Sequence, residues 1–272
     1  MKASKYIALA SLSILAAATI GSTTVSAAVA NDYDSKGSVT FRPSEDPTDP
    51  VDPENPDPNT PVDPVNPDGT DPEPGTKGPL SIDFASSFDF GTNQISSKDQ
   101  TYYARAQKYA EDAADPTKTH ADTANYVQVT DNRGNNAGWN LKVKQNKQFT
   151  ATDANAKHQV LDGAAITLAA PAVATSAGAT GVVTAPVATA TITLDPTGAA
   201  ESSVMAAAEN AGQGTWVDAW GTVEEVDEPQ AGGTTAKANV TKDVSLFVPG
   251  ATVKDAVKYE TTLTWILSDT PA

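Results

Sequence analysis

The sequence has no cysteine among its 272 residues. This absence excludes disulfides, thiol nucleophiles, thiolate zinc sites and cysteine-ligated iron–sulfur clusters. Because disulfides are excluded, the chain must obtain its stability from burial and strand pairing. The roughly 190 residues that follow the proline-rich region are enough for one ordinary domain with its own core.

Basic residues are scarce as well. Lys and Arg number 18 against 34 Asp and Glu, which gives a net charge of −16. Binding to phosphate backbones needs clustered Lys and Arg, so we expect no nucleic-acid partner. Salt screens the negative charge beyond about 10 Å, and any contact with an anionic polymer must therefore be short-range and specific.

The sequence also lacks an apolar run long enough to span a membrane. The run from Ile7 to Ile20 is shorter than the roughly 20 residues that a span needs. It follows Lys2 and Lys5 and precedes the small residues 25–27. This pattern is typical of a secretory signal peptide. We therefore expect residues 1–27 to be a signal peptide, and the mature chain to be secreted and without a membrane span.

Catalytic and metal-binding motifs are missing too. The two histidines, His120 and His158, have no metal-ligand spacing, and neither a GxSxG motif nor a phosphate-binding glycine loop occurs. Glu224, Glu225 and Asp227 could be imagined as a hydrolase pair, but adjacent acids are more typical of a solvated loop. We expect no enzyme activity, no cofactor and no metal site.

Proline is concentrated in one acidic region, between Pro43 and Pro79. Proline fixes φ and removes a backbone donor, and the acidic side chains repel one another. Both effects favour extended polyproline II, which at about 3.1 Å per residue would span on the order of 100 Å. We expect residues 28–79 to be an N-terminal segment and acidic proline-rich linker, either a stalk or a disordered tail. Within it, residues 38–41 could form one strand.

Short segments with period-2 alternation dominate from Leu80 onward, as in half-buried strands. They comprise residues 80–84, 126–130, 139–144, 165–168, 190–194 and 263–267. The Asn- and Gly-rich residues 131–138 are expected to close a hairpin. Residues 100–115 are interpreted as a strand followed by a loop, and residues 171–186 as either strands or an exposed insertion. The prediction is all-β: a single antiparallel β-sandwich or barrel-like domain over residues 80–272.

Two of the four tryptophans occur in the same tripeptide frame, Trp139-Asn140-Leu141 and Trp265-Ile266-Leu267. Residues i and i+2 of a strand share a face, so each tripeptide places an indole beside an isobutyl group. Such a face suits glycans, because sugar rings offer apolar C–H faces to π systems. It equally suits an ordinary core. For Trp216 and Trp220, which also share a strand face, core packing is favoured.

The sequence resembles the WxL-domain cell-surface proteins of Gram-positive bacteria, of the enterococcal and lactobacillal type. The residues that carry this resemblance are 126–134, 138–141 and Tyr259 to Pro271. The match covers most of residues 80–272. The resemblance implies a β-rich domain that associates non-covalently with peptidoglycan, often beside companion proteins that bind WxL domains. It makes four motif residues the candidate ligand-binding residues: Trp139, Leu141, Trp265 and Leu267.

We therefore expect non-covalent attachment to the peptidoglycan of the cell wall, at the cell surface. The alternative is a protein-binding module that docks a companion WxL-binding surface protein or a host extracellular-matrix protein. The final residues, 269–272, show no sortase-type sorting signal, which favours non-covalent attachment. We also expect the two motif strands to be neighbours, because the last strand must pair to satisfy its backbone groups.

Overall fold

The computed structural model describes residues 33–110, 120–176, 178–229 and 234–271. The chain divides into two units, Met1–Thr40 and Phe41–Ala272. In the first unit, residues 33–40 are exposed and have no regular secondary structure, so the strand expected at residues 38–41 is not formed. The expected signal peptide, residues 1–27, lies outside the described residues.

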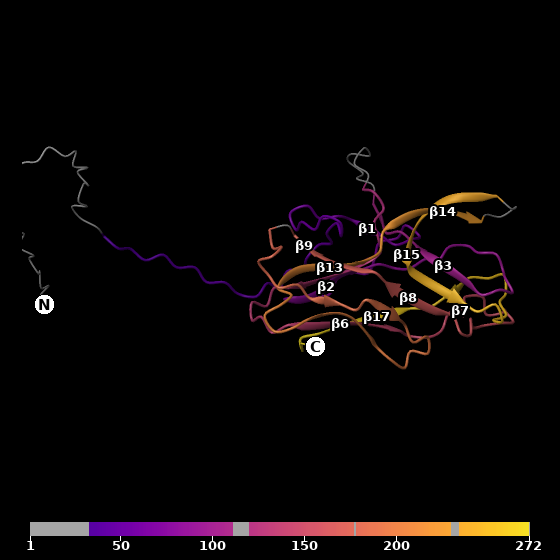
Figure 1. Cartoon of the computed structure of the whole chain (residues 1–272). Helices are drawn as coiled ribbons and strands as arrows, with labels where there is room; N and C mark the ends of the chain where they lie inside the picture. Colours follow the sequence, from indigo (N-terminus) through magenta and orange to yellow (C-terminus); the bar gives the residue numbers. More distant parts are fainter. Residues whose placement is uncertain (1–32, 111–119, 177, 230–233, 272) are drawn as a thin grey trace, which may run out of the picture. The chain divides into compact units, whose positions relative to one another are not determined.

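The second unit is all-β over its described residues, and all its strand pairs are antiparallel, as predicted (Figure 1). The β5 sheet has the order β2 (Leu80–Ala85), β5 (Tyr126–Asp131), β13 (Gly214–Trp220), β9 (Pro171–Thr175). The β6 sheet has the order β10 (Val187–Ala188), β12 (Ser202–Ala207), β6 (Trp139–Gln145), β17 (Leu263–Ser268).

The β15 sheet has the order β11 (Thr191–Thr193), β8 (Ala165–Ala169), β15 (Thr235–Val248), β14 (Val223–Pro229), and β3 (Gln100–Arg105) also pairs with β15. Two small sheets join β1 (Pro64–Val65) to β4 (Lys108–Tyr109) and β7 (Thr150–Ala151) to β16 (Tyr259–Glu260). No helix long and apolar enough to cross a membrane occurs among the residues described.

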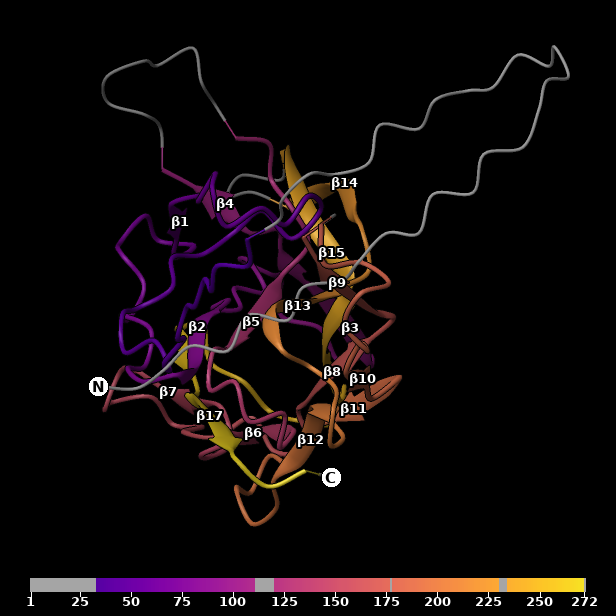
Figure 2. The same cartoon turned by 90° about the vertical axis from the view of Figure 1, so that its left-hand side faces the viewer.

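One hydrophobic core is shared by the three larger sheets, which surround a common interior in Figure 2. Each sheet contributes alternate residues, because side chains of a strand point to opposite faces in turn. Burial of each large apolar side chain contributes about 1.5–3 kcal/mol. The strand residues in this core include Val127 and Val129, Leu141 and Val143, Ile166 and Leu168, and Val244 and Leu246.

The acidic proline-rich segment packs against the outer face of the β5 sheet. Val51 is 0% exposed and belongs to a second apolar cluster with Phe84, Tyr126 and Val217. Its N–H donates to Gln128 Oε1 (2.8 Å), and Gln128 Nε2 donates to the carbonyl oxygen of Asp49 (3.0 Å). Strand β5 is consequently buried on both faces.

The expectation that the proline-rich residues 43–79 form a free stalk or a disordered tail is therefore wrong. The compact unit begins at Phe41 and not at Leu80. Within the segment, β1 pairs with β4, a strand that lies after the segment in the sequence. Proline composition predicts an extended backbone, but it does not exclude anchoring of that backbone by a single buried valine and the glutamine that bonds to it.

The loop over residues 131–138 does not close a hairpin. It leads from β5, which pairs with β2 and β13, to β6, which pairs with β12 and β17. Its turn chemistry was correctly predicted, since Asn136 (φ 55) and Gly138 (φ 75) are left-handed. A Cβ on Gly138 would lie 2.4 Å from the carbonyl oxygen of Ala207. Turn residues indicate a reversal, but they do not determine which sheet the next strand joins.

The two ambiguous regions are resolved in part. Residues 100–105 form strand β3, as expected, and residues 111–115 of the expected loop lie outside the described residues. Both alternatives apply to residues 171–186. Pro171–Thr175 forms β9 against β13, and the described residues from 178 to 185 form largely exposed turns and bridges.

Candidate functional site

The two Trp-x-Leu motifs lie on neighbouring strands, which confirms the expected pairing. Strand β17 pairs with β6 so that Leu267 faces Leu141 and Trp265 faces Val143. The strands are antiparallel, so the motifs run in opposite directions and the indoles lie on either side of the leucine pair. Trp265 is displaced along the sheet from Trp139 by four strand positions, roughly 14 Å. The motifs share a sheet face without forming one tryptophan cluster.

Trp139 is a core residue. Its side chain is 0% exposed, and its Nε1–H donates to the carbonyl oxygen of Gly212 (2.9 Å). Gly212 has a φ of +73°, and a Cβ there would lie 2.7 Å from Trp139 Nε1, so the close approach requires glycine. Leu141 is also 0% exposed. Of the two interpretations that the sequence left open, core packing therefore applies to Trp139 and Leu141, whose side chains are closed to solvent.

Trp265 and Leu267 are only partly buried. The Trp265 indole stacks on Trp220 with ring centroids 6.0 Å apart and an interplanar angle of 25°. Trp220 in turn meets the ring of Phe88 edge-on, with centroids 6.2 Å apart. Such aromatic pairs contribute about 0.5–1.5 kcal/mol beyond area burial. The second motif thus combines packing with partial access to solvent, and its ligand-binding role stays a prediction.

Trp216 and Trp220 are 3% and 0% exposed, which confirms the prediction of core packing. Asp218 lies between them on the same strand face and is 0% exposed. Neither carboxylate oxygen of Asp218 has a hydrogen-bond partner among the described residues. Burial raises the pKa of Asp218 to about 7, because removal from water disfavours the ionised form. The alternation of side chains along a strand places residues 216, 218 and 220 on one face, but a buried carboxyl group at Asp218 was not predicted.

A second buried carboxyl group, Asp83, is well bonded by comparison. Its oxygens accept hydrogen bonds from Ser81 (2.6 Å), Thr130 (2.6 Å) and Gln128 (2.9 Å). Burial raises the pKa of Asp83 to about 6, and these hydrogen bonds partly offset the effect. Asp83, on β2, is thereby linked to Gln128 of β5, the residue that holds the acidic segment.

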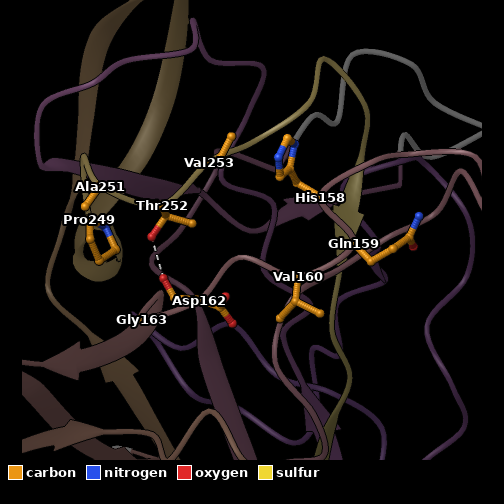
Figure 3. A pocket seen from close by; sticks show the side chains of 9 residues that line it. All are labelled: His158, Gln159, Val160, Asp162, Gly163, Pro249, Ala251, Thr252 and Val253. Atoms are coloured by element: carbon orange, nitrogen blue, oxygen red, sulfur yellow. Dashed lines mark hydrogen bonds between the residues drawn. The ribbon is translucent and has the colours of Figure 1, made fainter.

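A shallow hollow of about 670 Å³ is formed by the segments 158–163 and 249–253 (Figure 3). Val160 and Val253 are exposed there, and the Thr252 hydroxyl donates to the carbonyl oxygen of Asp162. At its rim, His158 Nδ1 lies 2.8 Å from Asp255 Oδ1, and this hydrogen bond lowers the pKa of Asp255. No pattern in the sequence indicates that these two segments meet.

Comparison with known proteins identifies the family. The model of the WxL domain, described as surface cell wall-binding, matches residues 28–271. No curated protein and no solved structure shows a significant match. The matched region includes the acidic proline-rich segment, in agreement with its packing on the β5 sheet. The chain belongs to the WxL domain surface cell wall-binding family.

Proposed function

We propose that this chain is a secreted surface protein that attaches non-covalently to the peptidoglycan of the Gram-positive cell wall. The family match carries this proposal, since a wall-binding family model spans residues 28–271. The matched region contains the described β unit almost entirely, which supports wall binding by that unit. The ligand must contact exposed residues of that unit, because Trp139 and Leu141 are enclosed in its core.

The chain's acidity sets the character of the contact. A net charge of −16 disfavours long-range attraction to anionic wall polymers. Affinity must come from close stacking and hydrogen bonding with the sugar and peptide parts of the wall. Such contacts are reversible, so chaotropes should release the bound protein intact.

Purified sacculi freed of protein and of anionic polymers test this function. The mature chain should sediment with them in a saturable manner, and soluble fragments of digested peptidoglycan should compete. A chain that stays in the supernatant with protein-free sacculi would refute direct peptidoglycan binding.

An observation on β17 favours a second candidate function, protein docking. This strand is at the edge of the β6 sheet and pairs only with β6 among the described strands. An edge strand presents unpaired N–H and C=O groups to which an extended partner segment can add. The partner would be a companion WxL-binding surface protein or a host matrix protein. Binding to native walls that disappears when wall proteins are stripped would select this candidate.

The proposal includes no catalytic step. Incubation of sacculi with the chain should release no soluble muropeptides, and chromatography of the supernatant checks this. Released fragments would assign the chain to the wall hydrolases instead.

A further inference from the structure

The outer face of the β15 sheet carries an unusual set of side chains. The inward residues of its strands, such as Val244, Leu246 and Ile192, belong to the main core. The alternate residues of β3, β15, β8 and β11 therefore point away from the core. We call eight of these outward residues the aromatic–threonine face: Thr101, Tyr103, Ala165, Thr167, Thr191, Thr193, Ser245 and Phe247. Arg105, Ala169 and Asp243 continue the same alternation at its ends.

Strand register places the two aromatic rings next to each other. Ser245 lies opposite Tyr103 on one side and Thr167 on the other. Phe247, two residues along β15, is thus the diagonal neighbour of Tyr103, at about 7–8 Å. Thr167 continues the row to Thr193, and their hydroxyl oxygens are 3.1 Å apart. The face is a platform with two rings at one side and a row of hydroxyl groups beside them.

Both rings are accessible to a ligand. Tyr103 is 36% exposed and Phe247 is 40% exposed, and they are the exposed aromatic side chains among the described strands. The other aromatic residues of the strands are partly or fully buried. Two aromatic rings displayed side by side on a sheet face are a feature that binding surfaces share.

The face is also electrically neutral in a strongly acidic protein. None of these eight residues carries a charge at neutral pH, whereas the whole chain has a net charge of −16. Arg105, the next outward residue of β3, has its charge paired with Glu228 at 2.6 Å and with Asp89 at 3.3 Å. The nearby Lys242 is paired with Glu224 at 2.6 Å, and Asp243 stands at one end of the platform. A neutral face of rings and hydroxyl groups complements an uncharged polar partner better than a polyanion or a polycation.

Sugar rings meet these requirements. A pyranose has apolar C–H faces that stack on aromatic rings. Its rim of hydroxyl groups donates and accepts hydrogen bonds, as the Ser and Thr hydroxyls do. We propose that the aromatic–threonine face binds the uncharged sugar rings of a wall glycan strand, with Tyr103 and Phe247 as stacking residues and the threonines as hydrogen-bonding residues. This inference rests on the proposed wall-binding function and locates its binding surface.

The test compares three variants with the wild-type mature chain on protein-free sacculi. Tyr103→Ser combined with Phe247→Thr removes both rings, and Thr193→Glu places a charge on the exposed β11 strand. Val187→Thr is the matched control, because Val187 is 75% exposed and lies on β10 of the β6 sheet, away from this face in sequence and in sheet. Near-ultraviolet circular dichroism confirms the fold of each variant. A titration with soluble N-acetylglucosamine oligomers, followed by Tyr and Trp fluorescence, reports glycan contact directly.

We expect the double variant and Thr193→Glu each to weaken retention at least about 10-fold, and Val187→Thr to bind as wild type. Equal retention of wild type and both face variants would overturn this inference while leaving the proposed function intact. Failure of the wild type itself to bind sacculi would overturn both. A wild-type dimer in sedimentation that the double variant abolishes without loss of wall retention would show that a second copy occupies the face, which also overturns the inference.

Discussion

The indole of Trp265 on edge strand β17 stacks on the indole of Trp220 on β13, with centroids 6.0 Å apart. The contact joins the β6 sheet to the β5 sheet. At the other motif, the indole of Trp139 is fixed by its hydrogen bond to the carbonyl oxygen of Gly212. The repeated tripeptide therefore has a structural meaning: each copy places a tryptophan that ties its strand to a different part of the domain.

Replacement of Trp139 by Ala should lower the free energy of unfolding by about 3–5 kcal/mol, as large-to-small core changes do. Replacement of Trp265 by Ala should cost less, about 2–3 kcal/mol, since this side chain is only partly buried. Urea unfolding followed by circular dichroism measures both, with Trp265→Phe as the conservative control. Equal costs at the two positions would contradict the difference in burial.

Double substitutions separate contacting pairs from distant ones. Trp220→Ala and Trp265→Ala should be non-additive by at least about 0.5 kcal/mol, because the rings touch. Trp139→Ala and Trp265→Ala should add within about 0.5 kcal/mol, because the indoles lie on opposite sides of the leucine pair. Coupling in the second pair that equals coupling in the first would show that the motifs form one cluster.

Asp218 should make the domain less stable as pH rises. Its pKa is about 7 in the folded chain against an ordinary value of 3.8 for an aspartate, so the folded state holds a proton that the unfolded state has released. The contribution is fully present below about pH 3.8 and is lost as pH rises through 7, with a magnitude of about 4 kcal/mol.

Asp218→Asn cannot ionise and provides the reference for this effect. The unfolding free energy of the Asn variant minus that of the wild type should grow between pH 4 and pH 8. Asp83 contributes equally to both proteins and cancels in the difference. A difference that is constant across this range would mean that Asp218 is not held protonated by burial.

Val51 should hold the acidic segment on the domain. Val51→Asp would bury a carboxylate in the cluster with Tyr126 and Val217, and the segment should detach. Limited proteolysis would then cut within residues 43–62 of the variant, whereas the wild type should resist. Val39→Asp, at a residue 75% exposed, is the matched control. Equal cleavage of the wild type would show that the segment is free in solution.

Alternation in the sequence predicted the strands well where one face is apolar and the other polar. Trp139 to Lys144 and Leu263 to Leu267 are examples, and their pairing followed from the need of a terminal strand for a partner. The same alternation could not tell whether the shared face of the motifs is core or ligand surface. Burial of Trp139 depends on Gly212, which is distant in sequence and whose close approach no local pattern reveals.

Tertiary contacts account for the other differences. The proline-rich segment has a composition typical of an isolated extended chain, and its docking depends on Val51 and on the distant Gln128. The sequence of strand β5 alternates between apolar and polar residues, yet both faces of the strand are buried. The proline-rich segment covers the outer face. The platform on the β15 sheet arises from residues of separate strands, so Tyr103 and Phe247 become neighbours only through register.

The central claim is direct, non-covalent attachment to peptidoglycan, and the most direct test is a binding and extraction measurement on protein-free sacculi. The mature chain should bind in a saturable manner, leave in full-length form with concentrated chaotrope, and rebind when the chaotrope is removed. No retention on these sacculi, or retention that survives boiling detergent and ends only with muralytic digestion, would contradict the claim.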